Sequence, residues 1–376
     1  MHNLKDPRER AVLVGVNFTD EKFHHTRESL DELELLAETA GAEVIGRVIQ
    51  TRPCPDKSTY IGKGKVEEVR RLVKESSAHH VIFDDDLSPS QVRNVEKSVE
   101  TSVIDRSGLI LDIFARRARS NAAKIQVELA QLKYLLPRLT GMWTHLERQE
   151  GAIGTRGPGE KQLEEDKQIM RKKITELRKK LKTIDNSRRE QRKRRNNLPA
   201  AAIVGYSNAG KSTLLSAMSK SNVYIEDKLF ATLDATTRKS FIPGFGEILL
   251  TDTVGFIKKL PHHLIESFKS TLDEAVAGDI IIRVTDISAE DYDKHISVVD
   301  DVLNDIGAFD TPVINVFNKA DTVDKKTIKK VTEKYPDALL ISARKNEGLE
   351  DLKEKLRQKT FELGFKSIYG NYDNKT

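Results

Sequence analysis

The stretch GYSNAGKS, residues 205–212, combines glycines, a lysine and a serine at a spacing that can bind phosphate groups. It fits the pattern G-x-x-x-x-G-K-S/T, directly after a strand-like run and before a helical one, which is the context that this motif needs. The glycines allow backbone N–H groups to wrap the phosphates, and the helix N-terminus adds its dipole. We expect Lys211 to reach the β- and γ-phosphates and the Ser212 hydroxyl to bind Mg²⁺. The predicted phosphate-binding residues are Gly205, Tyr206, Ser207, Asn208, Ala209, Gly210, Lys211 and Ser212.

A second phosphate-sensing segment, DTVG, follows the strand-like EILLT. Asp252 is expected to hold Mg²⁺ through a water, and the Gly255 N–H to sense the γ-phosphate. Thr253 and Val254 lie between them in the same predicted loop.

Two further segments predict which nucleotide base the site binds. NKAD, comprising Asn318, Lys319, Ala320 and Asp321, ends the strand-like PVINVF. Asp321 can accept two hydrogen bonds from guanine N1–H and N2–H₂, a pair that adenine does not offer. Asn318 is expected to brace the loop and the Lys319 stem to cover the base. SAR, comprising Ser342, Ala343 and Arg344, follows the next strand and would place the Ala343 N–H near guanine O6. Four such motifs in order, each at the carboxyl end of a strand, indicate one site for a guanine nucleotide.

The composition bounds what else the chain can be. Its 376 residues suit two domains, and 32% of them are charged. The single cysteine, Cys54, cannot form an intramolecular disulfide, so a reducing cytosol is expected. No run of 18 apolar residues occurs, so we expect no membrane span and a cytoplasmic location.

The N-terminal part predicts a small parallel sheet. Short apolar runs alternate there with helical stretches at βαβ spacing, namely AVLVGV, EVIGRVIQ, HHVIFDDD and TSVID. Within this part, YIGKGKVEEV sets two glycines and two lysines before a helix. An anion-binding nest is one interpretation, but a plain turn into the helix is the one we favour.

Two long helices follow. In the first, Ile125, Leu129, Leu132 and Leu136 recur at heptad-like spacing, and in the second so do Met170, Ile174, Leu177, Leu181 and Ile184. The simplest geometry is an antiparallel hairpin. Residues 166–195 hold 14 Lys or Arg against 4 Asp or Glu, whereas the rest of the chain carries a net charge of −5. The excess predicts a nucleic-acid contact; a solvated helix face is the alternative.

The segment between these helices is rich in glycine and contains Trp143, Arg148, Arg156 and Pro158. Arginine guanidinium groups and aromatic rings can stack on unpaired RNA bases, but the segment could equally be a disordered connection between the helices. The candidate RNA contacts are Arg148, Arg156, Arg171, Lys172, Lys173, Arg192, Lys193, Arg194 and Arg195.

Two segments narrow these motifs to a family. The set resembles translation-factor-like GTPases, and FATLDATTR, residues 230–238, looks like switch I of the HflX family. The run RSNAAKIQVELAQLKYLLPRLTG…IGTRGPGEKQLEEDK also resembles that family, and GTRGPGE is especially characteristic. The resemblance covers nearly the whole chain, with GAIG in place of a more usual double glycine and the C-terminal extension of some relatives largely absent. It adds Phe230, Ala231, Thr232, Leu233 and Asp234 to the expected nucleotide contacts.

The resemblance implies an α/β protein of several parts. We expect a small N-terminal α/β domain at 1–119, a helical hairpin at 120–197 with a tip at 140–160, a Ras-like P-loop GTPase domain at 198–362 and a short tail at 363–376. Thr232 would be the switch I threonine that closes on Mg²⁺ and the γ-phosphate. The implied function is that of a monomeric GTPase that binds the large ribosomal subunit and its rRNA, and that splits or rescues stalled ribosomes under stress.

Phe256 stands after DTVG, where many GTPases carry a catalytic glutamine. A phenyl ring cannot hydrogen-bond the attacking water, so slow turnover alone and completion by a partner are expected. In this hypothesis the partner orders the switches and expels Phe256 from the path of the water. Asn208 resembles the asparagine that holds K⁺ in cation-dependent GTPases, although it could simply stabilise its loop. We expect Lys211, Thr232, Gly255 and Asn208 to contribute to catalysis. A nucleotide-gated scaffold with negligible hydrolysis and an RNA-remodelling NTPase are the alternatives.

Overall fold

The computed structural model describes residues 9–19, 23–139, 158–193, 198–219, 229–230, 232–259, 278–308 and 310–367. The chain forms two compact units, one of residues 1–116 and 124–181 and one of residues 117–123 and 182–376. The division at 119, 197 and 362 expected from sequence stays a prediction. Within the described residues, no helix is long and apolar enough to cross a membrane.

The N-terminal unit is built on a parallel sheet of four strands in the order β2-β1-β3-β4. The strands are β1 (Arg10–Phe18), β2 (Glu43–Arg52), β3 (His80–Phe83) and β4 (Ser102–Asp105). Parallel strands need crossover connections, and these are α1 (Phe23–Thr39), α2 (Lys63–Ser76) and α3 (Pro89–Val99), with α4 (Arg106–Arg117) following the last strand. Strand β1 is buried along almost its whole length, as expected where helices cover both faces of a sheet.

Local sequence explains where these helices begin. Helix α3 starts with a capping box, in which the Gln91 N–H donates to Ser88 Oγ at 3.3 Å and the Ser88 N–H donates to Gln91 Oε1 at 2.9 Å. Helix α2 begins directly after Gly62, whose N–H donates to Gln50 Oε1 at 2.8 Å. The GKGK stretch is thus the start of a helix.

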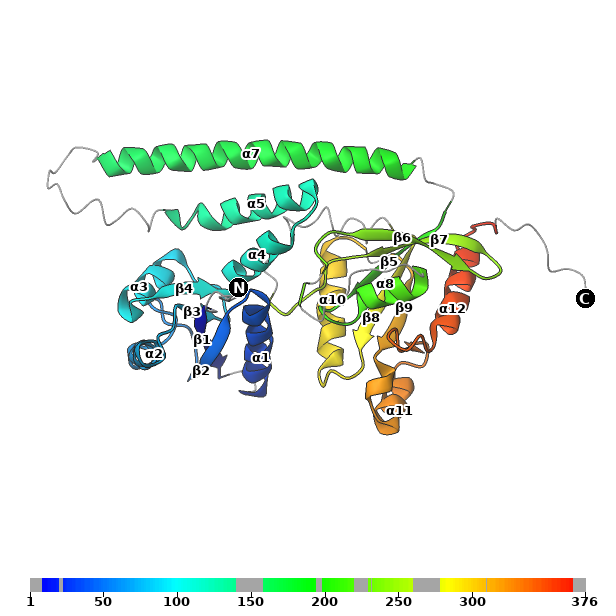
Figure 1. The fold of residues 1–376 in the computed structure, drawn as a ribbon, viewed down its shortest axis with the longest axis horizontal. Coiled ribbons are helices and arrows are strands. Elements are labelled where there is room, and N and C mark those ends of the chain that lie inside the picture. The colour runs from blue at the N-terminus through cyan, green and yellow to red at the C-terminus, as the bar shows by residue number, and fades with distance from the viewer. Residues whose placement is uncertain are drawn as a thin grey trace, which may run out of the picture. The chain divides into compact units, whose positions relative to one another are not determined.

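The predicted helical hairpin consists of α5 (Asn121–Leu135) and α7 (Pro158–Lys193), which run in opposite directions (Figure 1). Predicted seam residues of both helices are buried, among them Ile125, Leu129, Ile174, Leu177 and Leu181. An ion pair between Lys173 Nζ and Glu128, 2.5 Å apart, joins the two helices. The segment predicted as the tip, 140–157, lies outside the described residues.

The end of α5 is tied to the N-terminal sheet through Asp105. This fully buried carboxylate accepts from Tyr134 Oη at 2.7 Å, from the Arg138 guanidinium at 2.6 Å and from the backbone N–H groups of Gly108 and Leu87. Its negative charge is therefore neutralised and its lone pairs are used without water.

The second unit holds a six-stranded sheet in the order β10-β9-β8-β5-β7-β6. The strands are β5 (Ala200–Gly205), β6 (Thr236–Ile242), β7 (Gly246–Asp252), β8 (Ile280–Asp286), β9 (Val313–Asn318) and β10 (Leu339–Leu340), with β6 antiparallel to β7 and the other pairs parallel. Around them are α8 (Lys211–Ser219), α10 (Tyr292–Asp305), α11 (Lys325–Lys334) and α12 (Leu349–Glu362). The predicted α/β fold class, with a small parallel sheet in the N-terminal unit and a second, larger α/β unit after the hairpin, is confirmed.

Replacing Asp105 with alanine should destabilise the N-terminal unit by about 3 to 5 kcal/mol, because the Arg138 guanidinium would lose its carboxylate partner and Tyr134 Oη would lose Asp105 as its acceptor. Chemical denaturation followed by circular dichroism measures this. Asp112→Ala is the matched control, since the Asp112–Arg116 pair on α4 is half exposed at both partners and should contribute little. Equal loss of stability in the two variants would contradict the role given to Asp105.

Candidate nucleotide-binding site

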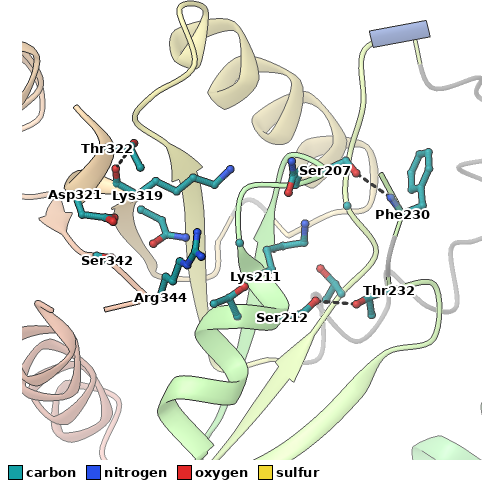
Figure 2. A pocket seen from close by; sticks show the side chains of 16 residues that line it. Ser207, Lys211, Ser212, Phe230, Thr232, Lys319, Asp321, Thr322, Ser342 and Arg344 are labelled. Carbon is teal, nitrogen blue, oxygen red and sulfur yellow. Dashed lines mark hydrogen bonds between the residues drawn. The ribbon is translucent and has the colours of Figure 1, made fainter. Parts of the chain in front are cut away.

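A cavity of about 530 Å³ lies at the carboxyl ends of the strands of the second unit (Figure 2). Most of the residues that line it were predicted from sequence: Ser207, Asn208, Gly210, Lys211, Ser212, Phe230, Thr232, Thr253, Gly255, Asn318, Lys319, Asp321, Ser342 and Arg344. Thr213 and Thr322 also line it and were not predicted. The sheet thus brings the four motifs, together with Phe230 and Thr232, to one place.

The phosphate-binding loop requires its glycines for a steric reason. Gly205 has φ +155°, and a Cβ there would lie 2.2 Å from the Val284 carbonyl oxygen. Gly210 has φ +90°, and a Cβ there would lie 2.2 Å from Asn318 Nδ2. A side chain at Gly205 would thus collide with backbone, and at both positions any other residue would be strained by the positive φ. Asn208 adopts φ +62°, a left-handed conformation that asparagine tolerates better than most residues.

Lys211 is buried at the start of α8, and its Nζ donates to the Tyr206 carbonyl at 2.9 Å. Burial lowers the pKa of Lys211 to about 8, and the nearby Asp252 carboxylate opposes that shift. An anionic phosphate beside Nζ would favour the charged ammonium in the same way.

Three side chains with oxygen atoms that could bind a metal ion meet beside Lys211. Ser212 Oγ donates to Asp252 Oδ2 at 2.6 Å and lies 2.8 Å from Thr232 Oγ1. The other oxygen of Asp252, Oδ1, is buried without a hydrogen-bond partner in the described part of the chain. Burial raises the pKa of Asp252, while Lys211 and Ser212 lower it. Two hydroxyls and a carboxylate with a free lone pair are the hard ligands that Mg²⁺ prefers, so these residues fit that ion.

On the base side, Asn318 joins two loops. Its Nδ2 donates to the Ala209 carbonyl at 2.9 Å and its Oδ1 accepts from the Ala343 N–H at 3.0 Å. Asn318 therefore braces the loop as predicted. The Ala343 N–H, expected near guanine O6, is engaged by Asn318, so a bound base would have to share it.

Asp321 and Lys319 are also held in place. The Ser342 hydroxyl lowers the pKa of Asp321, with a smaller effect from Lys345 at 3.4 Å, so the carboxylate is available as an ionised acceptor. Lys319 has φ +64°, and its Nζ lies 2.7 Å from Asp286 at the end of β8. This ion pair extends the Lys319 stem along the cavity wall (Figure 2).

Switch I is partly described. The Phe230 N–H donates to Ser207 Oγ at 3.0 Å, which closes this segment onto the phosphate-binding loop. Asp234 does not line the cavity, and its carboxylate accepts hydrogen bonds from Arg119 and Ser120 instead. The other predicted contacts outside the lining are Gly205, Tyr206, Ala209, Leu233, Asp252, Val254, Ala320 and Ala343. Ala231 lies outside the described residues.

Phe256 does not face the cavity. Its ring is 1% exposed and packs with Ala202, Val204, Ile281 and Val299 in a core under α10. Its backbone pairs with the phosphate-binding loop, because its N–H donates to the Gly205 carbonyl at 3.2 Å and its carbonyl accepts from the Ser207 N–H at 2.6 Å. The hypothesis that a partner must expel this ring from the path of the water is therefore wrong. The ring is a core residue.

Tyr206 adds a clamp that sequence reasoning missed. Its hydroxyl accepts from the Lys258 N–H at 2.6 Å, and its ring stacks on His295 of α10 with centroids 3.8 Å apart. A residue of the phosphate-binding loop, itself outside the cavity lining, thus holds the end of the segment 252–258, here called switch II.

The candidate RNA contacts are only partly described. Arg171, Lys172 and Lys173 are exposed on α7, although Lys173 pairs with Glu128, and Arg171 lies 3.5 Å from Glu164. Arg192 and Lys193 belong to α7, but their side chains lie outside the described part of the structure, as do Arg148, Arg156, Arg194 and Arg195 entirely.

Comparison with known proteins agrees with this geometry. Three family models match in succession: GTP-binding GTPase N-terminal over residues 27–115, GTP-binding GTPase Middle Region over 117–195 and 50S ribosome-binding GTPase over 200–319. The chain is 47% identical to the GTPase HflX of Caldanaerobacter subterraneus subsp. tengcongensis over 363 residues, covering 96% of this chain and 83% of that protein. It belongs to the HflX family of GTPases.

Other relatives extend the match. The GTPase HflX of Flavobacterium psychrophilum is 43% identical over 394 residues, covering 97% of this chain and 95% of that protein. The crystal structure of the SsGBP and GDP complex is 25% identical with a TM-score of 0.51, covering 94% of this chain and 99% of that one. This HflX-family protein is accordingly a GTPase, which converts GTP to GDP and phosphate.

Phe256→Gln tests the position of the ring. Introducing the glutamine amide into this core should lower the stability of the GTPase unit by about 3 kcal/mol and should not raise intrinsic GTP hydrolysis. Phe256→Leu, the matched control, keeps an apolar side chain and should cost about 1.5 kcal/mol or less. A glutamine variant that is stable and hydrolyses GTP faster than the wild type would contradict the assignment.

The stacked His295 predicts a pH dependence of stability. Burial lowers the pKa of His295 from 6.5 to about 4; Lys258 and Lys294 act in the same direction, and Asp291 and Asp286 oppose them. The folded state thus favours neutral His295. The contribution of neutral His295 to the free energy of unfolding is complete above pH 6.5. It is lost as the pH falls toward 4, because the histidine of the unfolded chain is protonated at a higher pH than that of the folded protein.

In His295→Phe the stack on Tyr206 can persist without this titration. Its stability should therefore fall less steeply than that of the wild type between pH 6.5 and 4.5, a window that lies between the two pKa values. Denaturant midpoints at several pH values measure the difference. Parallel curves for the two proteins would show that His295 does not titrate as described.

Proposed function

We propose that this GTPase binds the large ribosomal subunit, is activated there, and dissociates or rescues stalled ribosomes under stress. The main support for the ribosome as the partner is the match of residues 200–319 to the 50S ribosome-binding GTPase model. The exposed basic residues of α7 support contact with rRNA phosphates, because Lys and Arg dominate such interfaces.

Mg²⁺ is the proposed metal, held by Ser212 and Thr232, with Asp252 acting through a water. Bound there, the ion would neutralise charge that develops on the β- and γ-phosphates. Lys211 would exchange the Tyr206 carbonyl for phosphate oxygens, and Asp321 would select guanine through its two acceptor sites. Lys319, held by Asp286, would lie along the base.

Asn208 is a second candidate ion ligand, for K⁺ near the phosphates. It lines the cavity, which supports this role, but its left-handed backbone also gives an asparagine a purely conformational use there. Replacing K⁺ with Na⁺ distinguishes these two roles. GTP turnover should fall if Asn208 holds the ion and should stay the same if Asn208 only shapes the loop.

The need for a partner follows from the side chains of switch II. Phe256 is buried in the core, and the Thr253 hydroxyl donates to the Ile203 carbonyl at 2.8 Å. Neither side chain is free to orient the attacking water. Slow intrinsic hydrolysis is therefore expected, with the ribosome ordering the switches around the water.

Steady-state GTP hydrolysis with and without purified large ribosomal subunits, in potassium buffer, tests the proposal. Stimulation of about tenfold or more is expected.

Arg171→Ala with Lys172→Ala should weaken subunit binding and reduce the slope of log affinity against log salt by about 2. The matched control removes Lys329 and Lys330 from α11, which are also exposed. Tight GTP binding without stimulation would favour the scaffold with negligible hydrolysis.

A further inference from the structure

The carboxylate of Asp234, in switch I, holds the backbone at the point where helix α5 begins. Asp234 Oδ2 accepts from the Arg119 N–H at 3.1 Å and from the Ser120 N–H at 3.0 Å, and Oδ1 accepts from the Ser120 hydroxyl. Ser120 Oγ in turn accepts from the Ala123 N–H at 3.1 Å, which makes it the N-cap of α5. One side chain of switch I thus binds three donors that are more than a hundred residues away in sequence.

Asp234 is fixed on both sides to the proposed metal site. Two residues before it, Thr232 contacts Ser212, and the intervening Leu233 is 2% exposed. Two residues after it, Thr236 begins β6 and pairs with Asp252 across the β6–β7 ladder. A displacement of Thr232 from Ser212 therefore moves Asp234 relative to the start of α5.

Helix α5 is equally well fixed further along. Glu128 pairs with Lys173 of α7, and Tyr134 reaches the buried Asp105. Residues 117–123 belong to the GTPase unit, whereas residues 124–135 of the same helix belong to the other unit. Because an α-helix transmits displacement along its axis as a stiff element, its first turn is the place where switch I can act on the hairpin.

We propose that Asp234 is a positioning residue that couples closure of switch I to the start of the hairpin through Ser120. Closure of Thr232 on the metal site keeps the Asp234 contacts, and opening of switch I withdraws them. Coupling of this kind is reciprocal, so a partner on the hairpin would also favour closed switch I. The inference deepens the proposed function and depends on it only for the nature of that partner.

Hydrogen exchange of the Arg119, Ser120 and Ala123 amides tests the coupling without a ribosome. The protein is loaded with GDP or with a non-hydrolysable GTP analogue, in each case with Mg²⁺. In the wild type, exchange should be slower by about tenfold with the analogue. At the Ala123 amide, which loses its acceptor in Ser120→Ala, this difference should fall to less than about twofold, whereas Ser120→Thr, which keeps the hydroxyl, should restore it.

Ser88→Ala is the matched control. It removes the N-cap of α3, a helix of the N-terminal sheet, and should leave the nucleotide dependence at residues 119–123 unchanged. Equal exchange in both nucleotide states of the wild type would overturn the proposal, as would a nucleotide dependence at Ala123 in Ser120→Ala as large as in the wild type.

Ribosome-stimulated hydrolysis separates this inference from the proposed function. Ser120→Ala removes the hydroxyl contacts to Asp234 and Ala123, so it should keep GTP affinity and intrinsic turnover while lowering the stimulation. Stimulation that survives in full in Ser120→Ala would reject the coupling but leave the ribosomal function intact. A wild type that is not stimulated at all, yet shows nucleotide-dependent exchange at residues 119–123, would reject the ribosomal function and retain the coupling.

Discussion

The buried pair of Lys211 and Asp252 is the constraint around which the GTPase unit is organised. Burial disfavours the charged form of each, lowering the pKa of Lys211 and raising that of Asp252. Their mutual attraction opposes both shifts, and hydrogen bonds from Ser212, Thr232 and Thr253 further support the charged Asp252. An anionic phosphate and a cation would relieve both penalties at once. Without a ligand, the site therefore holds buried charges that are not fully compensated. Asp252 Oδ1, which is buried without a hydrogen-bond partner among the described residues, is the atom where a cation would provide the missing interaction.

Positioning this pair requires backbone segments to approach more closely than side chains would allow. Gly205 and Gly210 make room for the Val284 carbonyl and for the Asn318 amide, and Asn318 then connects the loop at Ala209 to the loop at Ala343. Phosphate binding and base recognition thus share one residue. The parallel sheet makes this possible, because it delivers the ends of β5, β7, β8 and β9 to a single edge.

The sequence predicted much of this arrangement but not all of it. Nearly continuous apolar runs identified the central parallel strands, and the glycine and lysine spacing identified the phosphate loop. Strand β6 was missed because TTRKSFI carries charges on an exposed edge and looks like a polar loop; antiparallel pairing with β7 is what makes it a strand. The direction of the Phe256 side chain depends on the backbone bridge to Tyr206, a tertiary contact that no local pattern encodes.

That bridge changes how hydrolysis can be controlled. If the Phe256 ring shielded the water, a partner would only have to displace one side chain. With the ring in the core under α10, and with Tyr206 binding the Lys258 N–H and stacking on His295, switch II is tied to the phosphate loop through its backbone. Local movement of Phe256 would expose apolar core surface, which is costly. At Thr232, by contrast, switch I is held through side-chain hydrogen bonds to Ser212 and Asp252, residues of the proposed metal site, and not through backbone pairing with the phosphate loop among the hydrogen bonds described. The conformational freedom that regulates this GTPase is therefore expected in switch I, the segment that also carries Asp234.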